Sequence, residues 1–307
     1  MRCSFCDNDA VIHIRYNGTH LCEKHFIRFF QKRVNLEFRN EVKIKGNTRI
    51  GVALSGGKDS SVALFETKRV FGKMRNVSII AITIDEGISG YRSKTIEAAV
   101  SLTKRLGVEH VILKMSDFYG ITMDEISTGR RMLPCSYCGV FRRKMINVGA
   151  LGQNLDYVVT GLNLDDTVQS FVMNMVRGDL ERLSRMGPHF TVKEGLVPRL
   201  QPLRKIPERE VLLYAILEKI EFSHAECPYA GFAIRNEFRN SIDSWEERTP
   251  GTKFALLNSY DQIKSLLSQK RTEPLGKCKV CGSPTPGDIC QSCLLKMEIE
   301  TWTSSQG

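Results

Sequence analysis

The chain has 307 residues, of which 42% are hydrophobic and 25% charged, and it carries a net charge of +10 with a sequence pI near 9.1. This length favours one large domain with appendages or two modest domains, and the apolar fraction can form a sizeable core. No apolar run is long enough to cross a membrane, and the start, Met1-Arg2-Cys3, lacks the apolar stretch of a signal peptide. We therefore expect a cytoplasmic protein, not bound to a membrane, with a polyanionic partner.

Cysteine is the most informative residue type in the chain. The cysteines form an N-terminal, an internal and a C-terminal group, and most of them occur as C-x-x-C pairs. In a reducing cytosol such pairs are typical of metal or redox sites rather than disulfides. The ten residues are Cys3, Cys6, Cys22, Cys135, Cys138, Cys227, Cys278, Cys281, Cys290 and Cys293.

The N-terminal group predicts a zinc site. Two C-x-x-[CH] knuckles flank a short β-like segment at 11–16, and three cysteines with one histidine suit tetrahedral zinc. The fourth ligand is expected to be the histidine that repeats the two-residue gap, rather than His13 or His20. The following segment, 26–38, predicts a basic helix, which is either a solvated surface or a nucleic-acid contact. The predicted ligands are Cys3, Cys6, Cys22 and His25.

The stretch Ser55-Gly56-Gly57-Lys58-Asp59-Ser60 follows an apolar run at 50–54 and precedes helix formers at 61–68. A strand, a glycine turn and a helix in this order form an anion site, because glycines let backbone N–H groups approach a ligand and the helix N-terminus adds partial positive charge. It is not a Walker A loop, since Gly51 lies one residue too far away and an aspartate follows the lysine. The stretch resembles the PP-loop, S-G-G-x-D-S, of ATP pyrophosphatases, which adenylate a substrate and release pyrophosphate.

Strand-like and helix-like segments alternate from residue 48 to about residue 220. Repeated βα units predict a doubly wound parallel α/β sheet, with ligands at the carboxyl ends of the strands. Three polar stretches fall at such ends, at 55–60, 84–87 and 161–166. The expected strands are 50–54, 77–84, 110–114 and 157–160, and the expected helices include 61–68, 93–106, one ending at 176, and 207–220.

Asp165 and Asp166 are adjacent carboxylates at the third of these strand ends. Such a pair is well placed to hold Mg²⁺ beside nucleotide phosphates. In a simpler interpretation, Asp165 only caps the helix that follows.

Three internal cysteines, Cys135, Cys138 and Cys227, bear on the chemistry. The P-C-x-x-C pattern also occurs in zinc nucleobase deaminases, but the H-x-E that those enzymes need upstream is found only downstream, at 224–226. Two interpretations stay open: thiols that carry sulfur as a persulfide or disulfide, or ligands of an iron–sulfur cluster with one open iron. A structural zinc site with His224 as fourth ligand is the simpler alternative.

Residues 177–205 predict a partly flexible basic loop near the strand ends, which either contacts phosphates or is only solvated. Residues 235–267 predict helices with a break at 249–251. The basic residues of the loop are Arg177, Arg182, Arg185, His189, Lys193, Arg199, Arg204 and Lys205.

The C-terminal group predicts a second zinc site. Two C-x-x-C knuckles are joined by a turn that contains Pro284, Pro286 and Gly287, as in a zinc ribbon with four cysteine ligands. The predicted ligands are Cys278, Cys281, Cys290 and Cys293.

The order of zinc finger, PP-loop region with three separated cysteines, and zinc finger resembles the tRNA 2-thiouridine synthetases of the TtuA type over essentially the whole chain. Asp85 and the T-G-x-N-x-D-D pattern at 160–166 belong to this resemblance. It implies a tRNA-uridine 2-sulfurtransferase, in which ATP adenylates C2 of a uridine, pyrophosphate leaves, and sulfur then displaces AMP. It favours uridine 54 in the T-loop over the wobble uridine 34.

The resemblance also implies the roles of residues. The three internal cysteines would hold an oxygen-sensitive [4Fe–4S] cluster whose open iron receives sulfide from a ubiquitin-like sulfur carrier with a C-terminal thiocarboxylate. Leu162 departs from the family, in which many members have histidine, so no role of that histidine is carried over. The implied nucleotide site is Ala53, Ser55, Gly56, Gly57, Lys58, Asp59, Ser60, Ile84, Gly161 and Asp166. The implied catalytic residues are Cys135, Cys138, Cys227, Asp59 and Asp166.

The expected cofactors are the [4Fe–4S] cluster, two zinc ions, ATP and Mg²⁺. The expected partners are tRNA and the sulfur carrier. The family also implies a homodimer. The expected domains are an N-terminal zinc finger (1–30), a PP-loop ATPase domain with the cluster cysteines (31–270) and a C-terminal zinc ribbon (271–307). One alternative is a persulfide thiolase similar to the 4-thiouridine type, which lacks flanking zinc knuckles. Another is a zinc-stapled RNA-binding protein without catalysis.

Overall fold

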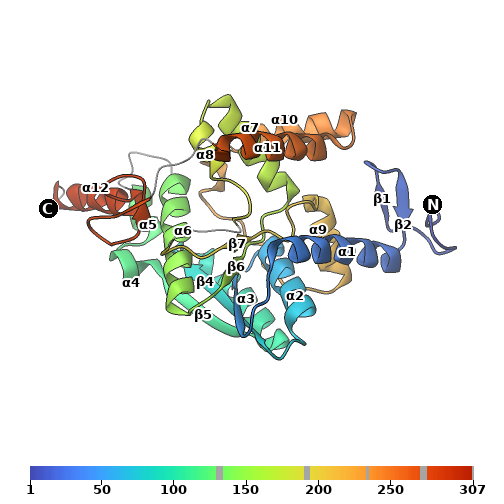
Figure 1. Ribbon diagram of the computed structural model, residues 1–307, viewed down its shortest axis with the longest axis horizontal. Coiled ribbons are helices and arrows are strands. Elements are labelled where there is room, and N and C mark those ends of the chain that lie inside the picture. Colours follow the sequence, from blue (N-terminus) through green and yellow to red (C-terminus); the bar gives the residue numbers. More distant parts are fainter. Residues whose placement is uncertain (129–133, 190–193, 233–234, 270–274, 306–307) are drawn as a thin grey trace.

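A five-stranded parallel sheet lies at the centre of the computed structural model, which describes residues 1–128, 134–189, 194–232, 235–269 and 275–305 (Figure 1). The strand order is β5-β4-β3-β6-β7, and every neighbouring pair is parallel. This confirms the predicted doubly wound α/β class. The strands are β3 (Thr48–Ala53), β4 (Val77–Asp85), β5 (Glu109–Lys114), β6 (Tyr157–Val159) and β7 (Arg199–Leu200).

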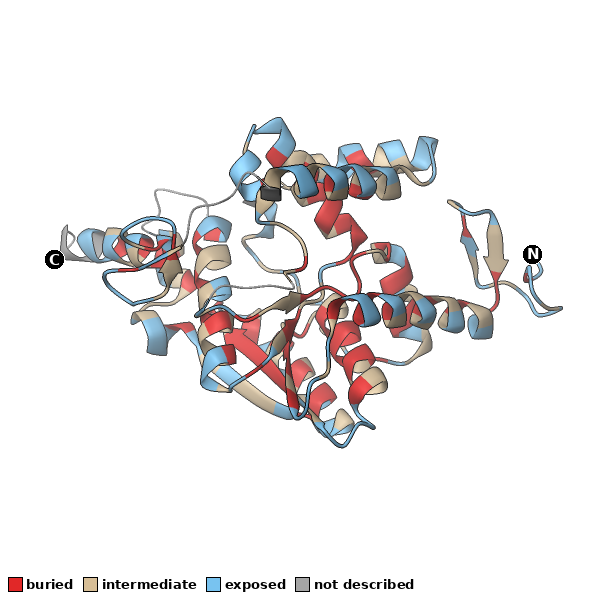
Figure 2. Cartoon of the chain, in the orientation of Figure 1, coloured by how far each residue is buried: buried red, intermediate tan, exposed pale blue. Residues whose placement is uncertain are grey.

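Two apolar clusters cover the two faces of this sheet, because successive strand residues point to opposite sides. Ala81 of β4 faces a cluster built with α1, α2, α3 and α9. Ile80 and Ile82 face the other cluster, built with α6 and α12. Figure 2 shows buried residues concentrated along the sheet and its flanking helices. The helices are α1 (Glu23–Glu41), α2 (Lys58–Phe71), α3 (Arg92–Leu106), α6 (Pro134–Gly152), α9 (Glu208–Leu217) and α12 (Gln291–Ser305).

A further group of helices packs around its own apolar cluster, which includes Phe171, Ile242 and Tyr260. These helices lie at the top of the view in Figure 1. α10 ends and α11 begins on either side of Gly251, whose φ of +99° favours glycine, so the predicted break at 249–251 is confirmed. The helices are α7 (Leu164–Val176), α8 (Leu180–Ser184), α10 (Arg235–Arg248) and α11 (Thr252–Gln269).

Two small antiparallel hairpins carry the terminal cysteine groups, and they lie at opposite ends of the molecule in Figure 1. The first is formed by β1 (Ile12–Ile14) and β2 (Thr19–Leu21), the second by β8 (Gly276–Lys277) and β9 (Pro284–Thr285). The remaining elements are the short helices α4 (Met115–Tyr119) and α5 (Met123–Thr128) and the 3-10 turn η1 (Ala230–Phe232).

The basic stretch 177–205 differs from its prediction as a loop, since it contains α8 and the edge strand β7. Asp179 caps α8 by accepting a hydrogen bond from the backbone N–H of Arg182 at 2.9 Å. β7 was not predicted from the sequence, because a strand of two residues is too short to show an alternating apolar pattern. The strand forms because its backbone pairs with Val158 and Val159 of β6. Lys193 lies outside the described residues.

None of the helices in the described ranges combines the length and the apolar character that a membrane span requires. The domain boundaries stay predictions. α1 runs through the expected boundary at residue 30, and the boundary at residue 270 lies outside the described part of the chain.

Candidate functional site

The loop between β3 and α2 is fixed by its two serines. The backbone N–H of Ser55 donates to Ser60 Oγ at 3.1 Å, and the two hydroxyls lie 3.0 Å apart. Ser60 Oγ in turn donates to the carbonyl of Gly57 at 2.9 Å. Gly56 has φ +85°, and a Cβ there would lie 1.9 Å from the carbonyl oxygen of Thr95 on α3, so only glycine fits. The loop therefore presents the open N-terminus of α2, which suits an anionic ligand.

Lys58 and Asp59 begin α2 and form the charged part of this loop. Lys58 Nζ lies 2.8 Å from Asp59 Oδ1 and 3.4 Å from Glu208 Oε1 at the start of α9. Asp59 Oδ1 also accepts a hydrogen bond from the side-chain amide of Asn163 at 3.1 Å. Lys58 and Glu208 line a pocket of about 460 Å³ that reaches α10 and the tip of the N-terminal hairpin.

The segment after β6 approaches α2 at Gly161. A Cβ on this residue would lie 2.7 Å from the backbone of Asp59 and Ser60, so the approach requires glycine. Asn163 and Asp166 then form a reciprocal capping box at the start of α7. The structure thus brings the predicted residues Gly161 and Asp166 to the PP-loop.

Asp166 is an unusual carboxylate. Its Oδ1 lies 3.4 Å from the guanidinium of Arg235 on α10. Burial raises its pKa to about 6; Arg235 opposes this rise, and the charge of Asp59 adds to it. Asp59 and Asp166 are neighbouring carboxylates, and a divalent cation bound between them would stabilise both in the ionised form. Asp59 and Asp166 could therefore hold Mg²⁺.

Asp165 does not cap α7, because Asn163 occupies the N-cap position. Its carboxylate instead pairs with Lys253 on α11 and accepts a hydrogen bond from the backbone N–H of Glu208 at 2.7 Å. The simpler interpretation of Asp165 as a helix cap was wrong. Asp165 joins α7, α9 and α11.

Ala53 and Ile84 stand at the carboxyl ends of β3 and β4. Ala53 is half-buried beside the cluster that contains Ile84, which is buried. The carbonyl oxygen of Ile84 accepts a hydrogen bond from Arg92. This arrangement places Ile84 next to the PP-loop, because Arg92 also donates to the carbonyl of Ser55 at 3.1 Å.

The three internal cysteines meet beside β4. Cys135 and Cys138 lie on the first turn of α6, and Cys135 Sγ is 3.6 Å from the carbonyl oxygen of Tyr229, two residues after Cys227. Cys138 and Cys227 pack against the same apolar cluster. Burial raises the pKa of Cys138 to about 11; Arg142 opposes this, and Glu86, Cys227 and Cys135 add to it. The three thiols therefore share one electrostatic environment.

The thiol spacing distinguishes this group from the terminal ones. Among the described residues, only the two terminal groups bring three or more ligand atoms within 4.8 Å of one another. His224, the fourth ligand of the zinc alternative, does not join Cys135, Cys138 and Cys227 at that spacing. The wider separation fits a group larger than a single ion, such as a four-iron cluster whose cysteines bind separate irons.

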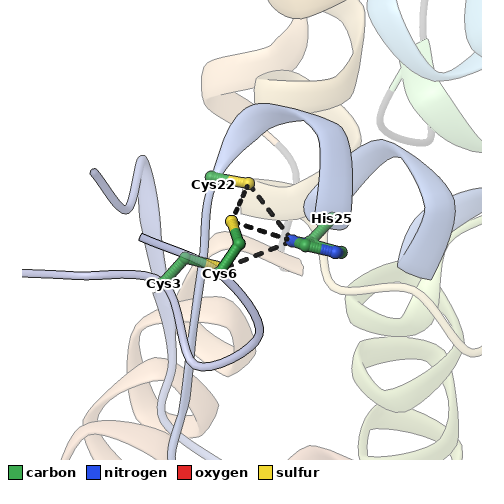
Figure 3. A group of neighbouring side chains, drawn as sticks. All are labelled: Cys3, Cys6, Cys22 and His25. Carbon is green, nitrogen blue, oxygen red and sulfur yellow. Dashed lines mark hydrogen bonds between the residues drawn. The ribbon is translucent and has the colours of Figure 1, made fainter. Parts of the chain in front are cut away.

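The N-terminal group has the geometry of a tetrahedral metal site (Figure 3). Cys6 and Cys22 sulfurs are 3.7 Å apart, and His25 Nδ1 lies 3.3–3.5 Å from the three sulfurs. Four ligands around zinc, at about 2.3 Å for sulfur, give sulfur–sulfur separations of about 3.8 Å. His25, not His13 or His20, completes this group, while His13 and His20 stack on each other with ring centroids 4.1 Å apart.

The C-terminal group shows the same spacing, with Cys281 and Cys290 sulfurs 3.6 Å apart. All four sulfurs lie within 4.8 Å of one another, so this group could also hold a metal ion. Both sets of donors, three thiols with one imidazole and four thiols, are those that structural zinc prefers.

Sequence reasoning missed the contacts of five charged residues that the fold brings to the site. Glu86 follows β4 directly and lies in the polar stretch 84–87, which was expected at a strand end. Its contacts to Arg92 and Arg142 depend on how α3 and α6 pack. Arg235 and Glu208 lie in stretches predicted only as helical. Nothing in their local pattern points to the nucleotide loop.

Known proteins resemble this chain along nearly its whole length. Residues 26–244 match the family described as PP-loop domain, and residues 2–27 match the TtuA N-terminal LIM domain of 2-thiouridine synthetase. The tRNA 2-thiolation protein NcsA of Haloferax volcanii is 35% identical over 98% of this chain and 99% of its own. The tRNA-5-methyluridine(54) 2-sulfurtransferase of Pyrococcus horikoshii is 34% identical over 99% and 97%.

A third relative, Cytoplasmic tRNA 2-thiolation protein 1 of Caenorhabditis briggsae, is 33% identical over 98% of this chain and 82% of its own. Among solved structures, the U34-tRNA thiolase NcsA from Methanococcus maripaludis with its [4Fe-4S] cluster is 32% identical, with a TM-score of 0.86 over 97% of this chain and 96% of that chain. The chain therefore belongs to the PP-loop family, among its tRNA 2-thiolation proteins and tRNA 2-sulfurtransferases.

Proposed function

We propose that this protein thiolates a tRNA uridine at C2 in an ATP-dependent reaction. One chain of contacts carries the proposal, because it joins the nucleotide loop to the cysteines. Arg92 donates to the carbonyl of Ser55 and pairs with Glu86 at 2.7 Å, and Glu86 lies 3.7 Å from Arg142 on the cysteine helix. Activation by ATP and delivery of sulfur would thus occur side by side.

The first step would be attack of the uridine C2 oxygen on the α-phosphorus of ATP. Pyrophosphate leaves. The C2 oxygen, which is a poor leaving group on its own, is now bonded to the AMP group and can leave with it. The N-terminus of α2 and Lys58 would bind the phosphates, and Asp59 and Asp166 would hold Mg²⁺, which offsets the charge that develops on the leaving pyrophosphate. Ile84 would lie beside the adenine, and Ala53 would line the nucleotide site.

The second step replaces oxygen by sulfur. A sulfur nucleophile attacks C2, the C2–O bond breaks, and AMP leaves with the oxygen. Cys135, Cys138 and Cys227 would hold a [4Fe–4S] cluster, whose open iron would bind the sulfide that the donor provides and keep it away from water. Arg142 offers positive charge to this anionic region, because Cys138 lies one helical turn before it on α6.

We further propose zinc at both terminal groups, a ubiquitin-like thiocarboxylate carrier as sulfur donor, and a homodimer. Cytoplasmic location is supported by the name of the Caenorhabditis briggsae relative. As the target we propose uridine 54, which the sequence resemblance favours. Uridine 34 is the second candidate, because the matching solved structure is named a U34-tRNA thiolase.

The adenylation step is tested with ATP, tRNA and a sulfide source under anaerobic conditions, by measuring pyrophosphate and 2-thiouridine. Wild type should release pyrophosphate only when tRNA is present, and Asp59→Ala should abolish both products. Asp117→Ala, an exposed aspartate on α4, is the matched control and should behave as wild type. An Asp59→Ala protein that still modified tRNA would refute adenylation, and wild type that bound tRNA without releasing pyrophosphate would indicate an RNA-binding protein.

The target uridine is identified with tRNA transcripts that carry cytidine at position 54 or at position 34. The transcript that lacks the target should yield no 2-thiouridine.

The cluster is tested separately, by quantifying iron, sulfide and zinc in anaerobically purified protein. About four irons and four sulfides per chain are expected, with loss of iron in Cys227→Ala. Protein that binds zinc but no iron after reconstitution would instead favour persulfide chemistry on the same three thiols.

A further inference from the structure

Helix α6 carries cysteines of the internal group and also contacts the C-terminal cysteine group. Its first turn carries Cys135 and Cys138, and Lys144, further along the same helix, reaches the C-terminal group. Lys144 Nζ donates to Cys281 Sγ at 3.5 Å and also to Ser283 Oγ. One rigid helix therefore links the proposed cluster ligands to a sulfur of the proposed zinc ribbon.

Other contacts make the ribbon and the helix a single packed unit. Leu295 and Ile299 of α12 are buried in the same cluster as Phe141 of α6. Tyr137 Oη donates to Glu298 at 3.5 Å, and Tyr119 and Ser292 hydroxyls lie 2.8 Å apart. Figure 1 shows α12 beside α6 at the end of the molecule that carries the C-terminus. Movement of the ribbon would therefore reach α6 directly.

The positive charge of Lys144 suits its place beside the C-terminal cysteine group. Four thiolates around one Zn²⁺ leave a net charge of −2, which a neighbouring ammonium partly offsets. No carboxylate of the described ranges lies within 4.0 Å of Lys144 Nζ, so the thiolate of Cys281 is the anion that this lysine contacts. Such partners of metal ligands commonly change metal affinity by about 10- to 100-fold when removed.

We propose that the C-terminal metal group positions the helix that carries Cys135 and Cys138, and that Lys144 is the positioning residue that couples them. With metal bound, Cys281 is a thiolate that accepts the Lys144 hydrogen bond and anchors α6. Without metal the anchor weakens, and the first turn of α6 loses part of its support. The link to iron binding rests on the proposed function; the link between metal and helix does not.

The test uses full-length, zinc-loaded Lys144→Met, with Lys144→Arg as the conservative variant. The matched control is Lys279→Met, which removes a lysine from the knuckle between Cys278 and Cys281. Lys279 is 70% exposed and pairs with Asp288 rather than with α6. We expect zinc release from one site to a chelator to be about tenfold faster in Lys144→Met than in the control. Hydrogen exchange of the α6 amides should rise in the same variant, and Lys144→Arg should restore both.

The proposal would be overturned if Lys144→Met released zinc and exchanged its α6 amides at the rates of the wild type. It would also be overturned if Lys279→Met showed the same increases as Lys144→Met. Iron content after anaerobic reconstitution adds an independent readout, which we expect to fall in Lys144→Met. If no variant binds iron, wild type included, while α6 exchange still follows Lys144, then the proposed function fails and the coupling stands. If iron binds equally in all variants and α6 exchange is unchanged, the coupling fails and the proposed function stands.

Discussion

Arg92 Nε lies 2.7 Å from Glu86 Oε2, and the two side chains are only 4% and 5% exposed. Arg92 also donates to the backbone carbonyls of Ser55 and Ile84, so one guanidinium joins the PP-loop to the end of β4. Charges buried to this degree need their partners, since removing one leaves the other desolvated and unpaired. The pair therefore links the nucleotide loop to the end of β4, where Glu86 also lies 3.7 Å from Arg142 on the cysteine helix.

Glu86→Gln should lower the free energy of unfolding by about 3 kcal/mol, because Arg92 loses its buried counter-charge. Urea unfolding of the purified protein measures this loss. Asp288→Asn, which breaks an exposed pair with Lys279, should change stability by less than about 1 kcal/mol. Equal effects of the two substitutions would show that the buried pair contributes no more than a surface pair.

Gly161→Ala should slow pyrophosphate release by up to about 10²-fold, because the added Cβ lies 2.7 Å from the backbone of Asp59 and displaces it. Gly152→Ala, at the end of α6, is the control, since nothing lies within 4 Å of a Cβ there. Steady-state pyrophosphate assays with both variants provide the comparison. Wild-type turnover in Gly161→Ala would mean that the close approach is dispensable.

Glu41 should make stability depend on pH. Burial raises its pKa to about 7 from 4.5, while Gln201 N–H donates to it at 2.7 Å. Between these two values the folded protein keeps a proton that the unfolded chain has released, so the free energy of unfolding falls as pH rises. The loss reaches up to about 3 kcal/mol and is complete above about pH 7.

Glu41→Gln keeps the acceptor for Gln201 and cannot ionise, so it should flatten this dependence. Urea unfolding at several pH values between about 4.5 and 8 tests it, and Glu109→Gln, an exposed residue at the start of β5, should keep the wild-type slope. A Glu41→Gln protein with the wild-type slope would assign the pH dependence to another group.

His25→Ala should reduce bound zinc from two ions per chain to one, because His25 Nδ1 completes the N-terminal group. His13→Ala should retain both ions, since His13 stacks on His20 outside that group. Elemental analysis of the purified variants distinguishes them. Loss of zinc in His13→Ala alone would reverse the assignment.

The sequence predicted what depends on neighbours along the chain. The glycine loop of Ser55–Ser60, the C-x-x-C knuckles and the four longer strands follow from local backbone conformation and from ligand spacing within one turn. It also favoured His25 over His13, because the two-residue gap fixes which side chains can converge on one ion.

Only the tertiary structure decided the partners of these motifs. Glu86 with Arg142, Asp166 with Arg235, and Lys144 with Cys281 are separated by dozens of residues or more, and their meeting depends on how helices cross the sheet. The edge strand β7 exists only because β6 offers unpaired backbone groups. Side-chain periodicity records which face of an element is buried but not which element covers it, so these contacts had no local signal.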